Sequence, residues 1–310
     1  MTVISARTLS SPRPDSASRR AAEGASLMRY RTTLGDFLRA RRSTCQPEDV
    51  GLDRDTSRRV PGLRRDEVAR LAGMSAEYYV RLEQGRVSTP SRQVIDALAR
   101  AMRLDHHAAD YMARLARGEG AFGAHADEFR EQAHTYQRLE GILQQWSATP
   151  AYLTDSNLDI IAANDLMVTL TGGTIAAGKN VVQATFVPEN RTALLEWENT
   201  ARAAVATLRY TADEDAPRFR QLVATLATDR DFDRIWHRYE VLCPGDYEVE
   251  ADSDFGVIRF GIRNFVLPDL RGCMVTVWHA DEGSAAADAF TQLRINRSAV
   301  ADRDLLAAAS

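Results

Sequence analysis

The side chains best suited to recognise another molecule lie in residues 63–86, LRRDEVARLAGMSAEYYVRLEQGR. Glu77 and Arg81 are four residues apart, so they share one face of any helix that contains both. A carboxylate and a guanidinium on one face can hydrogen-bond to base edges, and an arginine can bind guanine O6 and N7 together. Tyr79 and Leu82 are expected to point inward, which leaves the charged face for a DNA major groove.

Two helices and a tight turn are needed to position that face. Val68 and Leu71 occur at helical spacing and predict a helix over residues 65–72. Gly73 can adopt the left-handed conformation that ends a helix, and Ser75 can accept a backbone N–H bond at the start of the next one. The sequence therefore predicts a helix, a three-residue turn and a second helix.

Further helices are expected around this pair, because apolar residues recur at helical spacing on both sides of it. They are predicted at residues 33–42, 90–102 and 107–117. Together the five helices form a compact all-α domain. Residues 43–62 contain two prolines and two glycines and predict a loop. Arg58 and Arg59 at its tip are interpreted as solvated, with a phosphate contact as the alternative.

The stretch LAGMSAEYYVRLEQGR, with its glycine turn, serine cap and Leu-Glu-x-Gly end, resembles the lambda-repressor-like helix-turn-helix of the XRE family. The resemblance implies that base edges are contacted by Ser75, Ala76, Glu77 and Arg81. It also implies phosphate contacts by Arg65, Gln84 and Arg86. Arg92 is added to the phosphate contacts because it lies in the first turn of a predicted helix.

The same family pattern implies that Arg39 pairs with Glu83 and fixes the docking angle of the second helix. The glutamine that is common at the Arg65 position of that family is missing here. The operator sequence of a relative therefore does not transfer to this chain.

Charge is divided unevenly along the 310 residues. Residues 1–119 carry 22 arginines against 15 acidic residues, a charge of +7, whereas residues 120–310 carry −11. A basic half can neutralise phosphates and an acidic half cannot, which favours a DNA-binding domain followed by a sensor. The only lysine is Lys179, and this arginine bias is typical of a GC-rich bacterial genome.

Composition also bears on location. No run of about 18 apolar residues is present, so no transmembrane helix is expected. Residues 1–27 are rich in Ser, Arg, Ala and Pro and lack the apolar core of a secretory signal, so we expect a disordered extension and a cytoplasmic protein. Translation from Met28 instead of Met1 is left open. The three cysteines have no spacing suited to zinc.

The second half predicts an α+β domain. Strand-like residues flank the turn formers Asp155-Ser156-Asn157, which predicts a β-hairpin over residues 151–163, with Asn164 starting a helix. Helical patterns fill residues 189–237. Three strands are predicted at residues 247–251, 256–265 and 273–279. An amphipathic helix over residues 129–146 precedes the hairpin and carries an apolar seam suited to a dimer.

Strand, turn, strand, Asn and helix in this order resemble the opening of a PAS domain. Together, WSATPAYLTDSNLDIIAAN, FDRIWHRYEV and FGVIRFGIRNFVLPD resemble the ligand-binding domain of MmyB-like regulators, a PAS-like fold. The resemblance covers about residues 140–280 and implies a one-component transcription factor that senses an apolar or lipid-like small molecule. The family has a His-Pro before the glycine of the second strand, where this chain has Asp252-Ser253-Asp254-Phe255-Gly256. Any ligand contact made by that histidine is absent.

Aromatic side chains with a few polar groups suit an apolar ligand pocket. The candidates here are Trp146, Tyr152, Asn164, Phe186, Trp236, Phe260 and Phe265. The alternative for each of them is an ordinary place in the core. Arg238 and Arg263 are the candidates for binding an anionic head group.

The sequence predicts five consecutive segments. They are a disordered extension (1–27), a helix-turn-helix domain (28–118), a connecting helix (119–138), an MmyB-like, PAS-like domain (139–282) and a C-terminal tail (283–310). We expect a homodimer on double-stranded DNA with an inverted-repeat operator, because a twofold protein binds a twofold site. The alternative is a second domain that binds a protein partner instead of a small molecule.

An enzyme is not expected from this sequence. It contains no P-loop, no dinucleotide fingerprint and no nucleophile elbow, so no catalytic residue and no cofactor is assigned. Asp229, Asp231 and Asp233 lie near His237, but they are interpreted as a solvated helix face, and no metal ligand is assigned.

Overall fold

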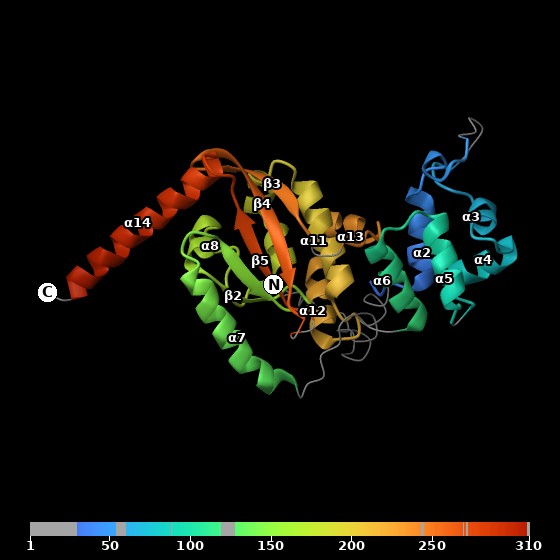
Figure 1. Cartoon of the computed structure of the whole chain (residues 1–310), viewed down its shortest axis with the longest axis horizontal. Helices are drawn as coiled ribbons and strands as arrows, with labels where there is room; N and C mark the ends of the chain where they lie inside the picture. Colours follow the sequence, from blue (N-terminus) through green and yellow to red (C-terminus); the bar gives the residue numbers. More distant parts are fainter. Residues whose placement is uncertain are drawn as a thin grey trace, which may run out of the picture. The chain divides into compact units, whose positions relative to one another are not determined.

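The computed structural model describes residues 30–53, 60–87, 89–118, 128–242, 245–268, 270 and 272–308. The disordered extension predicted over residues 1–27, and the arginine pair Arg58 and Arg59, lie outside the described residues. A helical region comes first along the chain, and an antiparallel sheet with helices follows it (Figure 1). This order confirms the predicted succession of an all-α and an α+β domain.

The described part of the first region contains five α-helices. They are α2 (Leu34–Thr44), α3 (Arg65–Leu71), α4 (Ala76–Glu83), α5 (Arg92–Ala101) and α6 (His106–Arg117). Four of them begin directly after a side chain that accepts a backbone N–H bond, namely Thr33, Ser75, Ser91 and Asp105. Such caps satisfy donors that the first turn of a helix leaves free. The loop predicted over residues 43–62 contains one short 3-10 helix, η1 (Glu48–Val50).

One apolar core holds these helices together. Phe37 and Leu38 of α2, Val68 of α3 and Leu98 of α5 are fully buried in it. Gly73 has a φ of +67° in the turn between α3 and α4, as predicted for the residue that ends the first helix of the pair. The sharp turn lets both helices contact the same core.

The second region is built on a five-stranded antiparallel sheet in the order β2-β1-β5-β4-β3. The strands are β1 (Ala151–Thr154), β2 (Ile160–Ala163), β3 (Tyr247–Ser253), β4 (Gly256–Val266) and β5 (Met274–His279). The hairpin predicted over residues 151–163 is β1 and β2. Asn164 accepts the Met167 backbone N–H and starts the next helix, as predicted.

Six short and medium helices connect β2 to β3. They are α8 (Asp165–Leu170), α9 (Val181–Thr185), α10 (Pro188–Ala193), α11 (Trp197–Thr211), α12 (Pro217–Leu226) and α13 (Arg230–Trp236). Two of them carry proline in the first turn, where its missing N–H costs nothing. This helical segment connects the two edge strands of the sheet, β2 and β3, and together with the antiparallel sheet it gives the domain its α+β class.

The two faces of the sheet have different coverings. Helix α7 (Glu128–Gln145) packs on one face, where Leu143 meets Leu153 and Val275. Side chains alternate along a strand, so Tyr152 and Thr276 point to the opposite face. Helices α8 to α11 lie over that second face, because residues from the loop after α8 and from α9 to α11 enclose a space with it.

Residues 283–310 were expected to form a tail, and their described part is helix α14 (Ala285–Ala308). Ala286, Ala289 and Phe290 are buried beside Ile258 and Phe260 of β4. The first turns of α14 therefore belong to the folded domain. No helix in the described segments combines the length and the hydropathy needed to cross a membrane.

Candidate functional site

The four residues predicted to contact base edges, Ser75, Ala76, Glu77 and Arg81, are all exposed, and we call them the recognition face. Tyr79 of the same helix is fully buried, as the predicted orientation of α4 requires. The Ser75 hydroxyl accepts the Tyr78 backbone N–H at 3.1 Å. Ser75 thus caps α4 while lying beside the groups that can contact base edges.

A buried carboxylate anchors the end of α4. Glu83 is 2% exposed, and its two oxygens accept bonds from Arg42 Nε at 2.6 Å and Arg65 Nε at 2.7 Å. Burial opposes the charge, but the hydrogen bonds from both arginines outweigh it and hold the pKa of Glu83 below its ordinary value. The carboxylate therefore stays ionised and joins α4 to α2 and α3.

The predicted pair of Arg39 and Glu83 is wrong in its arginine. Arg39 contacts the backbone carbonyl of Glu83, at 3.4 Å, and not its carboxylate. Its side chain is 53% exposed and lies 3.4 Å from the Asp36 carboxylate. Arg42 lies three residues further along the same face of α2, is 13% exposed and binds the carboxylate. One helical turn therefore separates the expected partner from the observed one.

Gly35 is a further residue on which the docking of α4 depends, and the sequence analysis missed it. A Cβ atom at Gly35 would overlap the Glu83 carbonyl oxygen, which belongs to the backbone and cannot move aside. The glycine lets α2 approach the end of α4 without a side chain between them. Its signal in the sequence is a glycine inside an otherwise regular amphipathic helix.

The four residues predicted to contact phosphates are all exposed, but they differ in whether the side chain already binds another residue. Arg65 keeps half of its side chain exposed while it binds Glu83. Arg92 is close to Asp96, at 3.3 Å, in a strongly exposed pair that is easily broken. Gln84 and Arg86 follow directly after α4 and are exposed to solvent. These positions surround the recognition face in the sequence.

A cavity of about 450 Å³ lies inside the second domain, between the sheet and helices α9 to α11. This volume falls within the range of small-molecule sites. Much of the wall is aliphatic or aromatic, including Leu158, Leu170, Ile175, Val249, Ile258 and Phe260. An apolar body of moderate size therefore fits the interior.

Polar groups from neighbouring strands form a row on the sheet side of this cavity. Thr276 donates to Asn264 at 2.7 Å, and the register pairs Tyr152 with Thr276. Burial raises the pKa of Tyr152 to about 12, although bonds with Thr276 and Trp278 oppose the shift. The Tyr152 hydroxyl therefore keeps its proton at neutral pH and can donate to a ligand.

Two of the seven pocket candidates, Tyr152 and Phe260, line the cavity. Phe265 does not, because it is five residues from Phe260 on the same strand and faces the opposite side of the sheet. It is 53% exposed there. Trp146 also lies outside the cavity, just past the end of α7, the helix on the opposite face, and is 39% exposed.

The other three candidates fill structural positions in the same domain. Asn164 uses its amide to hold the chain before β1, donating to the Thr149 carbonyl at 2.7 Å and accepting the Ala151 N–H at 3.1 Å. Phe186 packs edge-on against Trp197. Trp236 is fully buried with its ring under the Arg209 guanidinium. Residue type alone therefore did not predict which side of its helix or strand each candidate occupies.

Neither arginine considered for an anionic head group reaches the cavity. Arg238 binds Glu240 at 3.0 Å, and Arg263 lies 3.3 Å from Asp246. Among the described residues that line the cavity, none is Arg, Lys or His. The prediction that Arg238 and Arg263 bind an anionic head group in this cavity is therefore wrong.

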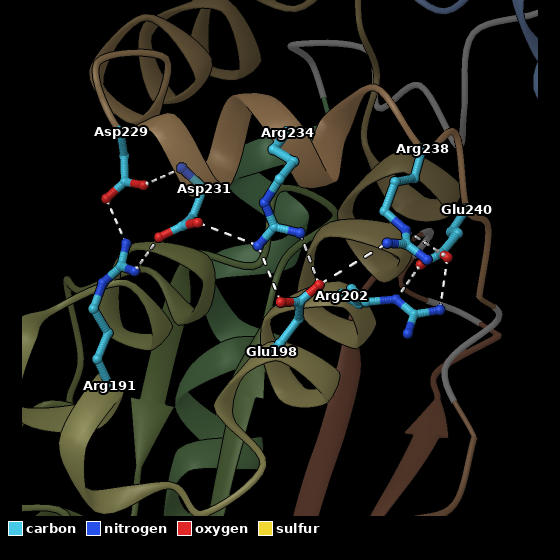
Figure 2. Close-up of polar contacts among 8 residues, drawn as sticks. All are labelled: Arg191, Glu198, Arg202, Asp229, Asp231, Arg234, Arg238 and Glu240. Atoms are coloured by element: carbon cyan, nitrogen blue, oxygen red, sulfur yellow. Dashed lines mark hydrogen bonds and ion pairs between the residues drawn. The ribbon is translucent and has the colours of Figure 1, made fainter.

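The aspartates of α13 are occupied by basic side chains. Arg191 binds Asp229 at 2.6 Å and Asp231 at 2.7 Å, and the ion pairs continue from Asp231 through Arg234 to Glu198 (Figure 2). Within the described part of the chain, no group of three His, Cys, Asp or Glu side chains is placed to hold a metal ion. Asp229 and Asp231 of the DRDFDR segment therefore form surface ion pairs with arginines.

Comparison with known proteins agrees with this division of the chain. Residues 136–293 match the model of the MmyB-like transcription regulator ligand binding domain, and residues 33–112 match a helix-turn-helix domain. No curated protein is similar enough to count as a match.

One solved structure, of an RNA-binding light-oxygen-voltage receptor, is similar at 10% identity and a TM-score of 0.23, covering 94% of this chain and 70% of that one. A TM-score of this size carries no argument. The ligand-domain match alone spans half of the chain. The protein therefore belongs to the helix-turn-helix transcription regulators with an MmyB-like ligand binding domain, and it is a DNA-binding regulator with a domain for a ligand.

Proposed function

We propose that this protein is a sequence-specific transcription regulator whose second domain binds an apolar small molecule. The observation that carries the proposal is the cavity of about 450 Å³ with largely apolar walls inside the domain of MmyB-like character. A recess with apolar walls and the volume of a small-molecule site favours a small molecule over a protein partner, which would need a broad exposed apolar surface.

The DNA-binding half of the proposal rests on α4. Its recognition face is exposed, and Glu83 with Arg42 and Arg65 fixes the angle at which that face is presented. We propose that Arg81 binds a guanine in the major groove and that Gln84 and Arg86 contact phosphates.

We further propose a homodimer on an inverted-repeat operator. Exposed Ile142 and Trp146 at the end of α7 provide an apolar surface for a second copy. A ligand then acts through different affinities for two states of the dimer. A regulator of this kind works where the chromosome is, so we place it in the cytoplasm of a bacterium.

Arg81→Ala tests the DNA half. Duplexes selected from a random library by the wild-type protein serve as targets, and binding is followed by fluorescence anisotropy. We expect a loss of about 1–3 kcal/mol for the selected site and a relaxed preference at one base pair. Arg100→Ala on α5 is the matched control for loss of one exposed positive charge. Unchanged affinity and base preference in Arg81→Ala would refute the recognition face.

Ala204→Phe tests the ligand half, because Ala204 of α11 lines the cavity. The neutral dye Nile red should bind the wild-type protein, and the added ring should block it. Ala224→Phe is the matched control, since Ala224 is exposed on α12. If the wild-type protein does not bind the dye, or if both variants bind it equally, the cavity is not the site.

A further inference from the structure

The charged side chains around the cavity all have one sign. Glu189, Asp252 and Asp254 are the charged residues among the described residues that line it. All three are exposed, and none of them forms an ion pair within the described part of the chain. We call them the rim carboxylates. Their free charge distinguishes them from the other acidic groups nearby.

The rim carboxylates come from elements that touch each other. Glu189 is in the first turn of α10, whereas Asp252 is in β3 and Asp254 follows that strand. A bridge between Leu194 and Ala251 joins the end of α10 to β3. The elements that carry the three exposed side chains are therefore neighbours in the cavity wall.

Basic side chains on α10 and on β4, the strand paired with β3, are already engaged in ion pairs. Arg191 of α10 binds Asp229 and Asp231. Arg259 of β4 binds Glu250. Because these arginines are paired elsewhere, no ion pair within the described part of the chain neutralises the negative charge at the rim.

An independent feature inside the cavity also points to a ligand. Thr154 is fully buried and lines the cavity, and its hydroxyl has no hydrogen-bond partner among the described residues. A buried hydroxyl without a partner costs free energy that a bound molecule can recover. The cavity therefore has an unsatisfied polar group within and uncompensated negative charge at its edge.

We propose that the cavity takes an amphiphilic molecule with an apolar body and a cationic, amine-type end at the rim carboxylates. This inference rests on the proposed ligand-binding function and narrows it to one chemical class. A carboxylate amphiphile such as a fatty acid would meet three negative charges at the rim and no cation inside, so it is disfavoured wherever its charge lies.

The test compares three probes that share a chain and differ in charge: dodecylamine, dodecanol and dodecanoate. Each displaces Nile red from the full-length protein at pH 7, below its micelle concentration. We expect the amine to bind most tightly and the carboxylate most weakly. Asp252→Asn combined with Asp254→Asn should lower the affinity for dodecylamine by roughly two- to five-fold per carboxylate and leave the affinity for dodecanol unchanged.

Glu282→Gln is the matched control, because Glu282 is exposed in the same domain and does not line the cavity. It should leave all three probes unchanged. The amine preference should also shrink at high salt, since exposed charges are screened.

The outcomes separate this inference from the proposal beneath it. If dodecanoate binds as tightly as dodecylamine, or if the preference for the amine survives the double substitution, the proposal of a cationic ligand is overturned. The proposal of an apolar ligand cavity still stands in either case, provided that Nile red binds. Absence of Nile red binding in the wild-type protein overturns both.

Discussion

The two domains treat their interiors in opposite ways. In the helix-turn-helix domain, Phe37, Leu38 and Leu98 leave no measurable surface exposed in the apolar core. In the ligand domain, Tyr152 and Phe260 instead face an unfilled space of about 450 Å³. A filled core holds helix angles rigidly, whereas a cavity leaves binding energy available to a ligand. The difference separates a domain that must keep one geometry from a domain that must admit a molecule.

Their carboxylates differ in the same way. Glu83 is buried and satisfied by two arginines, so it serves the fixed geometry of α4. The rim carboxylates Asp252 and Asp254 are exposed and free of ion pairs within the described residues. A charge that is already neutralised supports structure, while a charge that is not neutralised is available for binding.

Among the substitutions that test this comparison, Glu83→Ala should cause the largest loss of stability. It removes the carboxylate from Arg42, whose side chain is 13% exposed and which keeps its bond to the Leu63 carbonyl. Breaking a buried pair costs about 3–5 kcal/mol. We expect hydrogen exchange of the α4 amides to accelerate strongly in the full-length protein, with the ligand domain unchanged. Glu77→Ala on the same helix is exposed and should change stability by less than about 0.5 kcal/mol. Equal exchange in the two variants would refute the anchor.

Two substitutions of opposite type compare the cores directly. Leu98→Ala removes volume from the filled core and should cost about 3 kcal/mol. Ala204→Phe adds volume beside the cavity and should cost less than about 1 kcal/mol, because the ring enters existing space. Thermal unfolding of each variant measures both effects. A large penalty for Ala204→Phe would mean that the cavity is not open to a side chain.

Glu83 at the end of α4 and Asp155 in the β1–β2 hairpin should respond to acid with opposite signs. The lowered pKa of Glu83 means that its contribution is present above the unfolded value and is lost as pH falls through the folded one. Burial raises the pKa of Asp155, in the hairpin of the ligand domain, to about 6. Its charge therefore destabilises the fold above pH 6, and stability rises as pH falls toward about 4.

Hydrogen exchange between pH 4 and pH 7, corrected for the intrinsic rate, measures both trends. The Asp155 effect should be roughly 1 to 3 kcal/mol. Asp155→Asn should abolish the trend in the β1–β2 hairpin and leave α4 unchanged. The same slope in both domains would contradict the assignment.

The smallest effect is expected for the ion pairs on α13. Arg191→Met removes the bonds to Asp229 and Asp231 and should cost about 1 kcal/mol or less, because these pairs are partly exposed. The difference should shrink in 1 M salt. Arg230→Met, at an exposed position of α13, is the control and should not change stability. An effect that is independent of salt would assign the loss to packing of Arg191 on Trp197.

Sequence reasoning succeeded where the signal was local. Gly73, Ser75 and Asn164 were placed correctly because a turn or a cap depends on residues within a few positions of it. It failed for Arg39, since the choice between two arginines on one helix face depends on where α4 crosses α2. It also failed for Phe265, although strand alternation from Phe260 was a usable signal.

The sequence by itself determined the elements, the division into a helical and an α+β domain, and the exposed face of α4. These follow from hydrophobic periodicity and capping, which act over a few residues. Only the tertiary structure decided that Arg42 binds Glu83, that Gly35 admits the end of α4, and that the charged residues in the described lining of the cavity are all acidic. Those facts depend on which distant segments meet, and contacts between distant segments leave no regular spacing in the chain.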